Sequence, residues 1–184
     1  MFSEEKAAQI AAYFLRLRGG QMSYLKLMKL MYLADRESMA RYDEPMTDDS
    51  WFSMDKGPVL STVLDLFQGG SRTGAWERWV AGADNHEVRL AKEIREEDDF
   101  DELSDADREM LDAVWVEHGK KTRWDLVDYT HDHCPEWRDP HRSALPISPQ
   151  DMLRALGREK EEANQLASQI FERRRKQDFL ARIR

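Results

Sequence analysis

The sequence is poor in the features that mark secreted and membrane-spanning proteins. A single cysteine, Cys134, excludes an internal disulfide framework and is typical of a reducing compartment. No run of about 18 apolar residues occurs, so no segment is predicted to span a bilayer. The opening residues Ser3–Lys6 do not resemble the basic region of a signal peptide. These absences predict a cytoplasmic protein without a membrane partner.

Positive charge is also in deficit. The 184 residues include 36 acidic and 28 strongly basic side chains, for a net charge of -8. Cationic charge supplies most non-specific affinity for nucleic acid, so we do not expect nucleic acid as a partner. The charge is uneven, because residues 96–112 are densely acidic and residues 173–176 are basic. A chain of this length is about one domain.

The most apolar stretch is residues 25–36, and it predicts the central element of the fold. Leu27, Leu30, Met31 and Ala34 follow the spacing of one helix face. Apolar residues cover the neighbouring face as well, so we expect this helix inside the core. Ser23 is suited to cap its start. The residues expected to face water are Lys26, Lys29, Arg36 and Glu37.

The rest of the chain predicts a mainly α protein with little β structure. Further helices are expected in residues 3–18, 104–119, 122–133, 148–156 and 159–180, and another that begins at Pro58 and ends before Gly69. Residues 51–54 predict a short strand, and residues 76–80 and 86–90 a small antiparallel hairpin. We therefore predict a helical domain over residues 1–146 and a C-terminal helical extension over residues 147–184.

The candidate chemical groups do not assemble a catalytic or metal site. His131 and His133 are two residues apart on a predicted helix, so they point to different faces, and no second ligand pair accompanies Cys134. We expect no metal or other cofactor, and Cys134 packed as a small apolar residue. Asp35 on the apolar side of the central helix is either a structural hydrogen-bond acceptor or a general base with a raised pKa; the sequence favours the first.

Two segments together resemble a known family, the SocA-like Panacea domain of bacterial and phage antitoxins, and a third segment adds to the resemblance. The first segment is the helix with Lys29, Tyr32 and Asp35. The second is the Gly57-Pro58-Val59 turn, and the third carries His131 and Trp137. The resemblance covers about residues 23–137. Family members often differ at three neighbouring positions, which here are Lys56, Leu60 and Leu64.

The resemblance implies a mostly helical fold, no enzymatic activity and direct binding of a toxin encoded beside the chain. That is the behaviour of a type II antitoxin. Two alternatives stay open, namely a proteolytic adaptor that delivers a toxin to a protease and a DNA-binding regulator of the operon. The negative charge counts against the second.

The C-terminal segment is the candidate partner-binding element. Its predicted helix has only a thin apolar line, so it must dock on the domain, on a second copy or on a partner. A homo-oligomer is therefore possible, and a helix folded back over the core is an equal alternative. The candidate partner-binding residues are Arg173, Arg174, Arg175, Lys176 and Phe179.

Overall fold

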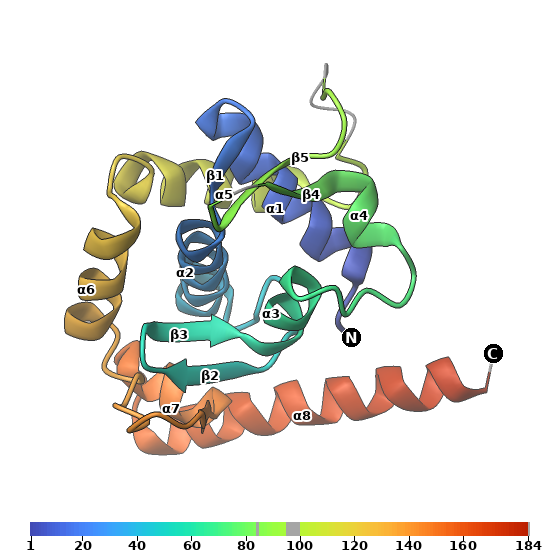
Figure 1. Cartoon of the computed structure of the whole chain (residues 1–184). Coiled ribbons are helices and arrows are strands. Elements are labelled where there is room, and N and C mark those ends of the chain that lie inside the picture. Colours follow the sequence, from blue (N-terminus) through green and yellow to red (C-terminus); the bar gives the residue numbers. More distant parts are fainter. Residues whose placement is uncertain (84, 95–99, 184) are drawn as a thin grey trace.

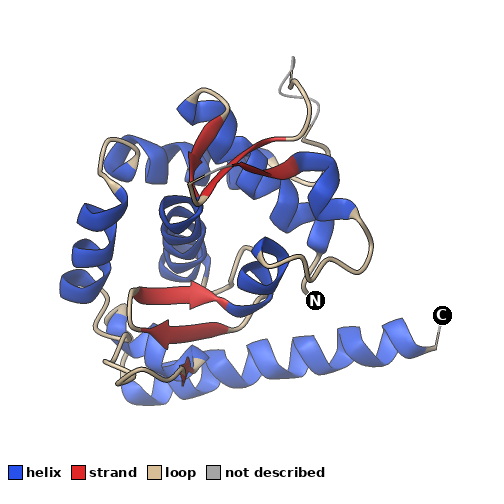
Figure 2. Ribbon diagram, in the orientation of Figure 1, coloured by secondary structure: helices blue, strands red, loops and turns tan. Residues whose placement is uncertain are grey.

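The chain forms a mainly α-helical structure with two small antiparallel sheets (Figures 1 and 2), as the sequence predicts. The computed structural model describes residues 1–83, 85–94 and 100–183. The helices are α1 (Glu4–Arg18), α2 (Tyr24–Tyr42), α3 (Ser61–Phe67), α4 (Ala75–Trp79), α5 (Asp105–His118), α6 (Arg123–His133), α7 (Pro149–Ala155) and α8 (Lys160–Arg182). The strands are β1 (Gln21–Ser23), β2 (Trp51–Met54), β3 (Gly57–Leu60), β4 (Val80–Ala83), β5 (Glu87–Leu90) and β6 (Leu145–Ile147).

Helix α2 lies in the middle of the molecule, as predicted (Figure 1). It contacts helices α1, α3, α5, α6 and α7 and strands β1 and β3. Two sequence expectations about it were wrong. Lys26 and Lys29 are buried rather than solvated, with 7% and 0% of their surface exposed. Ser23 is the N-cap residue, but its hydroxyl makes no capping hydrogen bond.

The first sheet has the strand order β1-β5-β4 and contains the predicted hairpin. The first strand of the hairpin, β4, starts at Val80 and not at the predicted residue 76, because residues 75–79 form helix α4. Trp76 and Trp79 are three residues apart, and helical geometry buries both indole rings on one side. The carboxylate of Glu4 accepts a hydrogen bond from the backbone N–H of Trp76, which holds α4 against α1. Periodicity over five residues could not distinguish the two conformations.

The second sheet has the strand order β3-β2-β6. Pro58 lies in β3 opposite Ser53, so the prediction that it begins a helix was wrong. The following helix, α3, begins at Ser61. The backbone N–H groups at its start have a partner outside the helix. The Asp49 carboxylate accepts hydrogen bonds from the N–H groups of Thr62 and Val63. Strand β6 is not among the strands that the sequence predicts, and it pairs with β2.

Three helix starts follow the sequence prediction closely. Helices α5, α6 and α7 each begin with a capping box, in which a hydroxyl and an aspartate satisfy one another's backbone amides. The caps are Ser104, Thr122 and Ser148. Much of the acidic stretch before α5, residues 95–99, lies outside the described residues.

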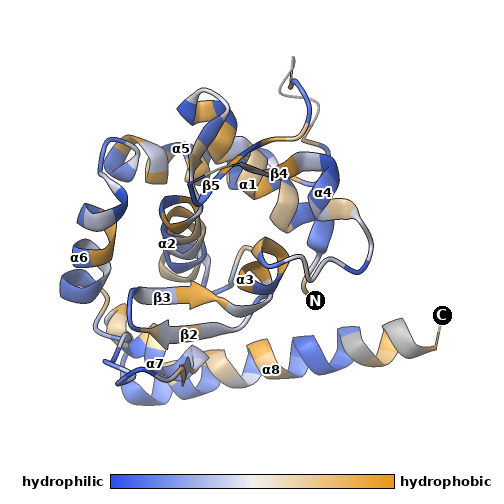
Figure 3. Cartoon of the chain, in the orientation of Figure 1, coloured by the Kyte–Doolittle hydropathy of each residue, from blue (hydrophilic) through white to orange (hydrophobic). Residues whose placement is uncertain are grey.

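Helix α8 lies along the lower side of the molecule (Figure 1). Its first half packs against α7, and Ala163, Ala167 and Ile170 are buried. Figure 3 shows a largely hydrophilic helix with isolated hydrophobic positions. Phe179 and Ile183 near its end are 64% and 65% exposed. None of the helices among the described residues has the length and hydropathy that crossing a membrane requires.

A charge placed inside α2 should unfold the protein. The Met31 side chain is fully buried, so Met31→Asp would bury an unpaired carboxylate at a cost of several kcal/mol out of roughly 5–15 kcal/mol of total stability. We expect no cooperative thermal transition by circular dichroism. Val116→Asp is the control, because Val116 is 81% exposed on α5 and should melt like the wild type. A Met31→Asp variant that melts near the wild-type temperature would show that α2 is not central.

Candidate functional site

The motif residues of α2 and β3 meet at a buried lysine. The Lys29 ammonium donates a hydrogen bond to the Pro58 carbonyl at 2.7 Å. Gly57 has a φ of +89°, and a Cβ atom there would lie 2.5 Å from Thr130 Oγ1 and 3.1 Å from Lys29 Nζ. Only glycine therefore lets α2, β3 and α6 approach this closely. Val59, the third residue of the turn motif, is also buried.

Asp35 lies six residues after Lys29 on α2 and is fully buried. Its carboxylate accepts hydrogen bonds from the Thr47 backbone N–H at 2.8 Å, the Thr47 hydroxyl at 2.9 Å and the Trp51 indole N–H at 2.9 Å. Burial raises its pKa to about 7, although these hydrogen bonds oppose the increase. The contacts fit the structural interpretation of Asp35, because they fix the segment that leads into β2.

Glu136 is a buried partner that sequence reasoning missed. Its carboxylate accepts from the Tyr32 hydroxyl at 2.6 Å and from Arg36 Nε at 2.8 Å. Burial, followed by the negative charge of Glu136, raises the pKa of Tyr32. Tyr32 and Arg36 are four residues apart on one face of α2, and this spacing was the only available signal. The contact ties α2 to the turn after α6.

The third motif segment, which carries His131 and Trp137, packs against β2. The rings of His131 and Trp137 stack with centroids 3.9 Å apart, and the Trp137 indole donates to the Met54 carbonyl at 3.0 Å. His133 instead stacks on Tyr129, so the two histidines diverge as predicted. Cys134 is buried in the hydrophobic core, as expected, and burial raises the pKa of its thiol to about 12. Among the described residues, no group of three His, Cys, Asp or Glu side chains is arranged to hold a metal.

The candidate partner-binding residues on α8 divide into two groups. Arg173 pairs with Glu44, and Arg174 donates to the Asp49 carbonyl at 3.1 Å. These two arginines therefore hold α8 against the segment that follows α2. The second group is exposed and consists of Arg175, Lys176 and Phe179.

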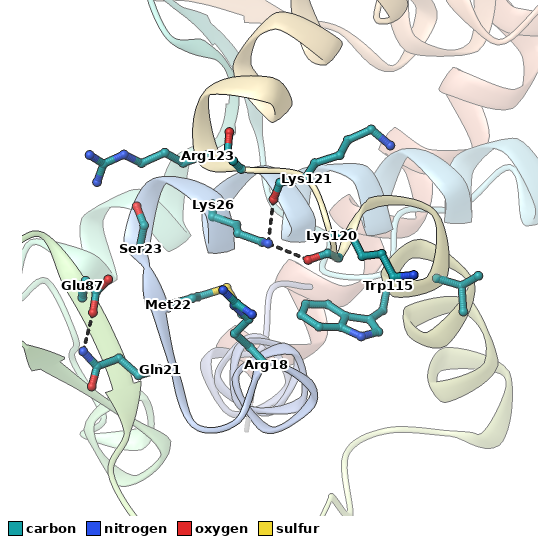
Figure 4. Close-up of a pocket in the computed structure, with 13 residues that line it drawn as sticks. Arg18, Gln21, Met22, Ser23, Lys26, Glu87, Trp115, Lys120, Lys121 and Arg123 are labelled. Atoms are coloured by element: carbon teal, nitrogen blue, oxygen red, sulfur yellow. Dashed lines mark hydrogen bonds between the residues drawn. The ribbon is translucent and has the colours of Figure 1, made fainter.

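A basic groove lies between the end of α1, β1 and the turn that joins α5 to α6 (Figure 4). Its volume is about 830 Å³, and five cationic side chains line it: Arg18, Lys26, Lys120, Lys121 and Arg123. Lys26 Nζ donates to the carbonyls of Gly119 and Lys121, both at 2.7 Å. Sequence reasoning missed this groove, because its cations come from distant parts of the chain. In the sequence, the Lys120-Lys121 pair before Arg123 was the signal that could have indicated this groove.

These contacts define a mainly α-helical domain that buries the motif residues of α2 and β3, while His131 and Trp137 are partly exposed. A family model described as the antitoxin SocA-like Panacea domain matches residues 27–138, which is more than half of the chain. The chain belongs to this family, as the resemblance predicted. The match takes in all three motif segments. No curated protein and no solved structure matches the chain.

The close approach at Gly57 gives a graded prediction for stability. Gly57→Ala combines an unfavourable positive φ with a collision, so we expect a loss of roughly 2–5 kcal/mol in the free energy of unfolding. Gly20→Ala has a φ of +103° but open space and should cost only about 1–2 kcal/mol. Gly82→Ala has neither and should be near neutral. Urea denaturation of all three tests the order, and equal losses at Gly57 and Gly20 would contradict it.

Lys29 predicts a pH dependence of stability. Burial lowers its pKa to about 7 from an ordinary value near 10.5. Between these pH values the unfolded chain binds a proton that the folded chain has released, so this group makes stability rise with pH by up to about 1.4 kcal/mol per unit. We expect Lys29→Met to remove this contribution in urea denaturation between pH 7 and 9. Parallel pH profiles for the variant and the wild type would contradict the assignment.

Proposed function

We propose that the chain is a cytoplasmic type II antitoxin that neutralises a cognate toxin by binding it directly. The observation that carries this proposal is the family match over residues 27–138. The burial of the motif residues of α2 and β3 supports a division of roles, in which they build the fold and exposed residues contact the toxin. Lys29 and Asp35, two buried ionisable groups in the motifs, hold internal partners, which supports binding rather than catalysis.

The last turns of α8 are the contact surface that we propose for the toxin. Phe171, Phe179, Leu180 and Ile183 are large apolar residues, each between 46% and 65% exposed. Apolar residues presented on one helix are suited to a groove in a partner. Arg173 and Arg174 fix the helix to the domain upstream of most of them, which lowers the entropy that binding must overcome.

Rescue of cell growth tests the function and the surface together. The chain is co-expressed with the toxic product of the neighbouring reading frame, and the wild type should restore growth. Phe179→Asp should lose rescue without a change in melting temperature, because the side chain is already exposed. Tyr42→Asp is the matched control, since Tyr42 is an aromatic residue that is 53% exposed elsewhere.

Each other outcome of this experiment has a definite meaning. Rescue by Phe179→Asp would show that the toxin binds another surface. A wild-type chain that neither rescues nor binds the neighbouring product would contradict the antitoxin proposal. Rescue that disappears in cells without the housekeeping proteases would replace direct neutralisation with the adaptor mechanism. A mobility shift with the upstream DNA would favour the regulator.

A further inference from the structure

The basic groove defined above has a charge that its own lining does not balance. Five cations face one acidic lining residue, Glu87, in a chain whose net charge is -8. Glu87 already accepts a hydrogen bond from Gln21. The nearby carboxylate of Asp125 is used in the cap of α6 through Thr122. Both carboxylates keep their negative charge, and Asp125 also interacts with Lys26 and Lys121, but the five cations still outnumber these two carboxylates.

The turn between α5 and α6, which carries two of the cations, is anchored to α2. Lys26 extends from α2 beneath the turn and holds the carbonyls of Gly119 and Lys121, so the turn that carries Lys120 and Lys121 is tied to the central helix. Figure 4 shows this pair of hydrogen bonds beside the ring of Trp115. Burial, followed by the positive charge of Arg18, lowers the pKa of Lys26, whereas Asp125 raises it. Arg18 and Lys26 thus repel one another, and a bound anion would relieve that repulsion.

Helix α2 begins in the same groove, and no side chain caps the backbone N–H groups at its start. Its N-cap, Ser23, makes no capping hydrogen bond, and its first turn has no acidic residue. The Ser23 hydroxyl is buried and has no hydrogen-bond partner. By contrast, α5, α6 and α7 all start with an aspartate that satisfies backbone amides. The positive end of the α2 dipole adds to the attraction for an anion.

We propose that this groove binds an acidic segment of a partner protein. Carboxylates would lie against Arg18, Lys120 and Arg123, and an apolar side chain would contact Trp115 and Met22, which line the same groove. A volume of about 830 Å³ is in the usual range for a ligand site and accommodates only a short stretch of chain. A long nucleic acid would extend beyond the groove onto a protein that is acidic as a whole.

If the proposed function holds, this partner is the toxin. The inference rests on the proposed function for the identity of the partner and for nothing else.

The groove variant combines Arg18→Glu, Lys120→Glu and Arg123→Glu, all at exposed positions. Lys26 and Lys121 stay unchanged because they hold the turn. The matched control combines Lys56→Glu, Arg154→Glu and Lys160→Glu, which are exposed cations outside the groove. Both variants should melt close to the wild-type temperature.

The first measurement is a fluorescence anisotropy titration with a labelled octaglutamate peptide. We expect the wild type and the control to bind, and the groove variant to bind at least about tenfold more weakly, since attraction turns into repulsion. Binding should weaken between about 50 and 300 mM salt. A thymidine oligonucleotide of the same charge should compete poorly. Equal affinities of all three proteins, or tighter binding of the oligonucleotide, would overturn the proposal.

The second measurement separates this inference from the proposed function. The wild type, the groove variant and the control are each tested for rescue from, and binding to, the product of the neighbouring reading frame. Loss of both in the groove variant alone supports the inference. If all three rescue equally, the groove inference fails and the antitoxin function stands. If the wild type does not rescue, the antitoxin function fails, and the peptide titration alone decides whether the groove binds an acidic segment.

Discussion

The structure depends on Lys29, a residue of the central helix α2 whose side chain is fully buried. Moving an ammonium group out of water costs several kcal/mol unless it is deprotonated or well paired. Lys29 meets that cost with a single short hydrogen bond to the Pro58 carbonyl and with a pKa lowered to about 7. The contact requires a backbone that comes within reach of the amine, and Gly57 makes this possible. The lysine and the glycine-proline turn are thus parts of one constraint, which explains why both occur together in the family motif.

The same principle applies along the whole of α2. Lys26 holds the α5–α6 turn, Asp35 holds the segment before β2, and Tyr32 reaches the turn after α6 through Glu136. Each of these buried polar groups of α2 has a partner in a different element. Together with the contact of Lys29 to β3, one helix therefore fixes the position of four surrounding segments. Hydrophobic burial gives the helix its central place, and these hydrogen bonds determine which arrangement of the neighbours is stable.

The sequence predicted those features that are encoded locally. The position of α2 followed from apolar periodicity, and the starts of α5, α6 and α7 followed from a hydroxyl and an aspartate three residues apart. The burial of Lys26 and Lys29 was missed because their partners are backbone carbonyls, which leave no pattern in the sequence. Pro58 satisfies the rules for a helix start and for an edge strand alike, and the pairing with Ser53 decided between them. Glu136 and the basic groove depend on contacts between distant residues, so only the fold brings them together.

The central claim is that the family motif builds the core while exposed residues recognise the partner. Hydrogen–deuterium exchange of the chain, alone and bound to its toxin, tests this most directly. The account predicts that the amides of residues 27–36, Gly57 and Val59 exchange slowly in the free chain and change little on binding. Added protection should appear at residues 120–123, between α5 and α6, and in the last turns of α8. Fast exchange of the motif amides in the free chain, with protection gained there on binding, would contradict the account.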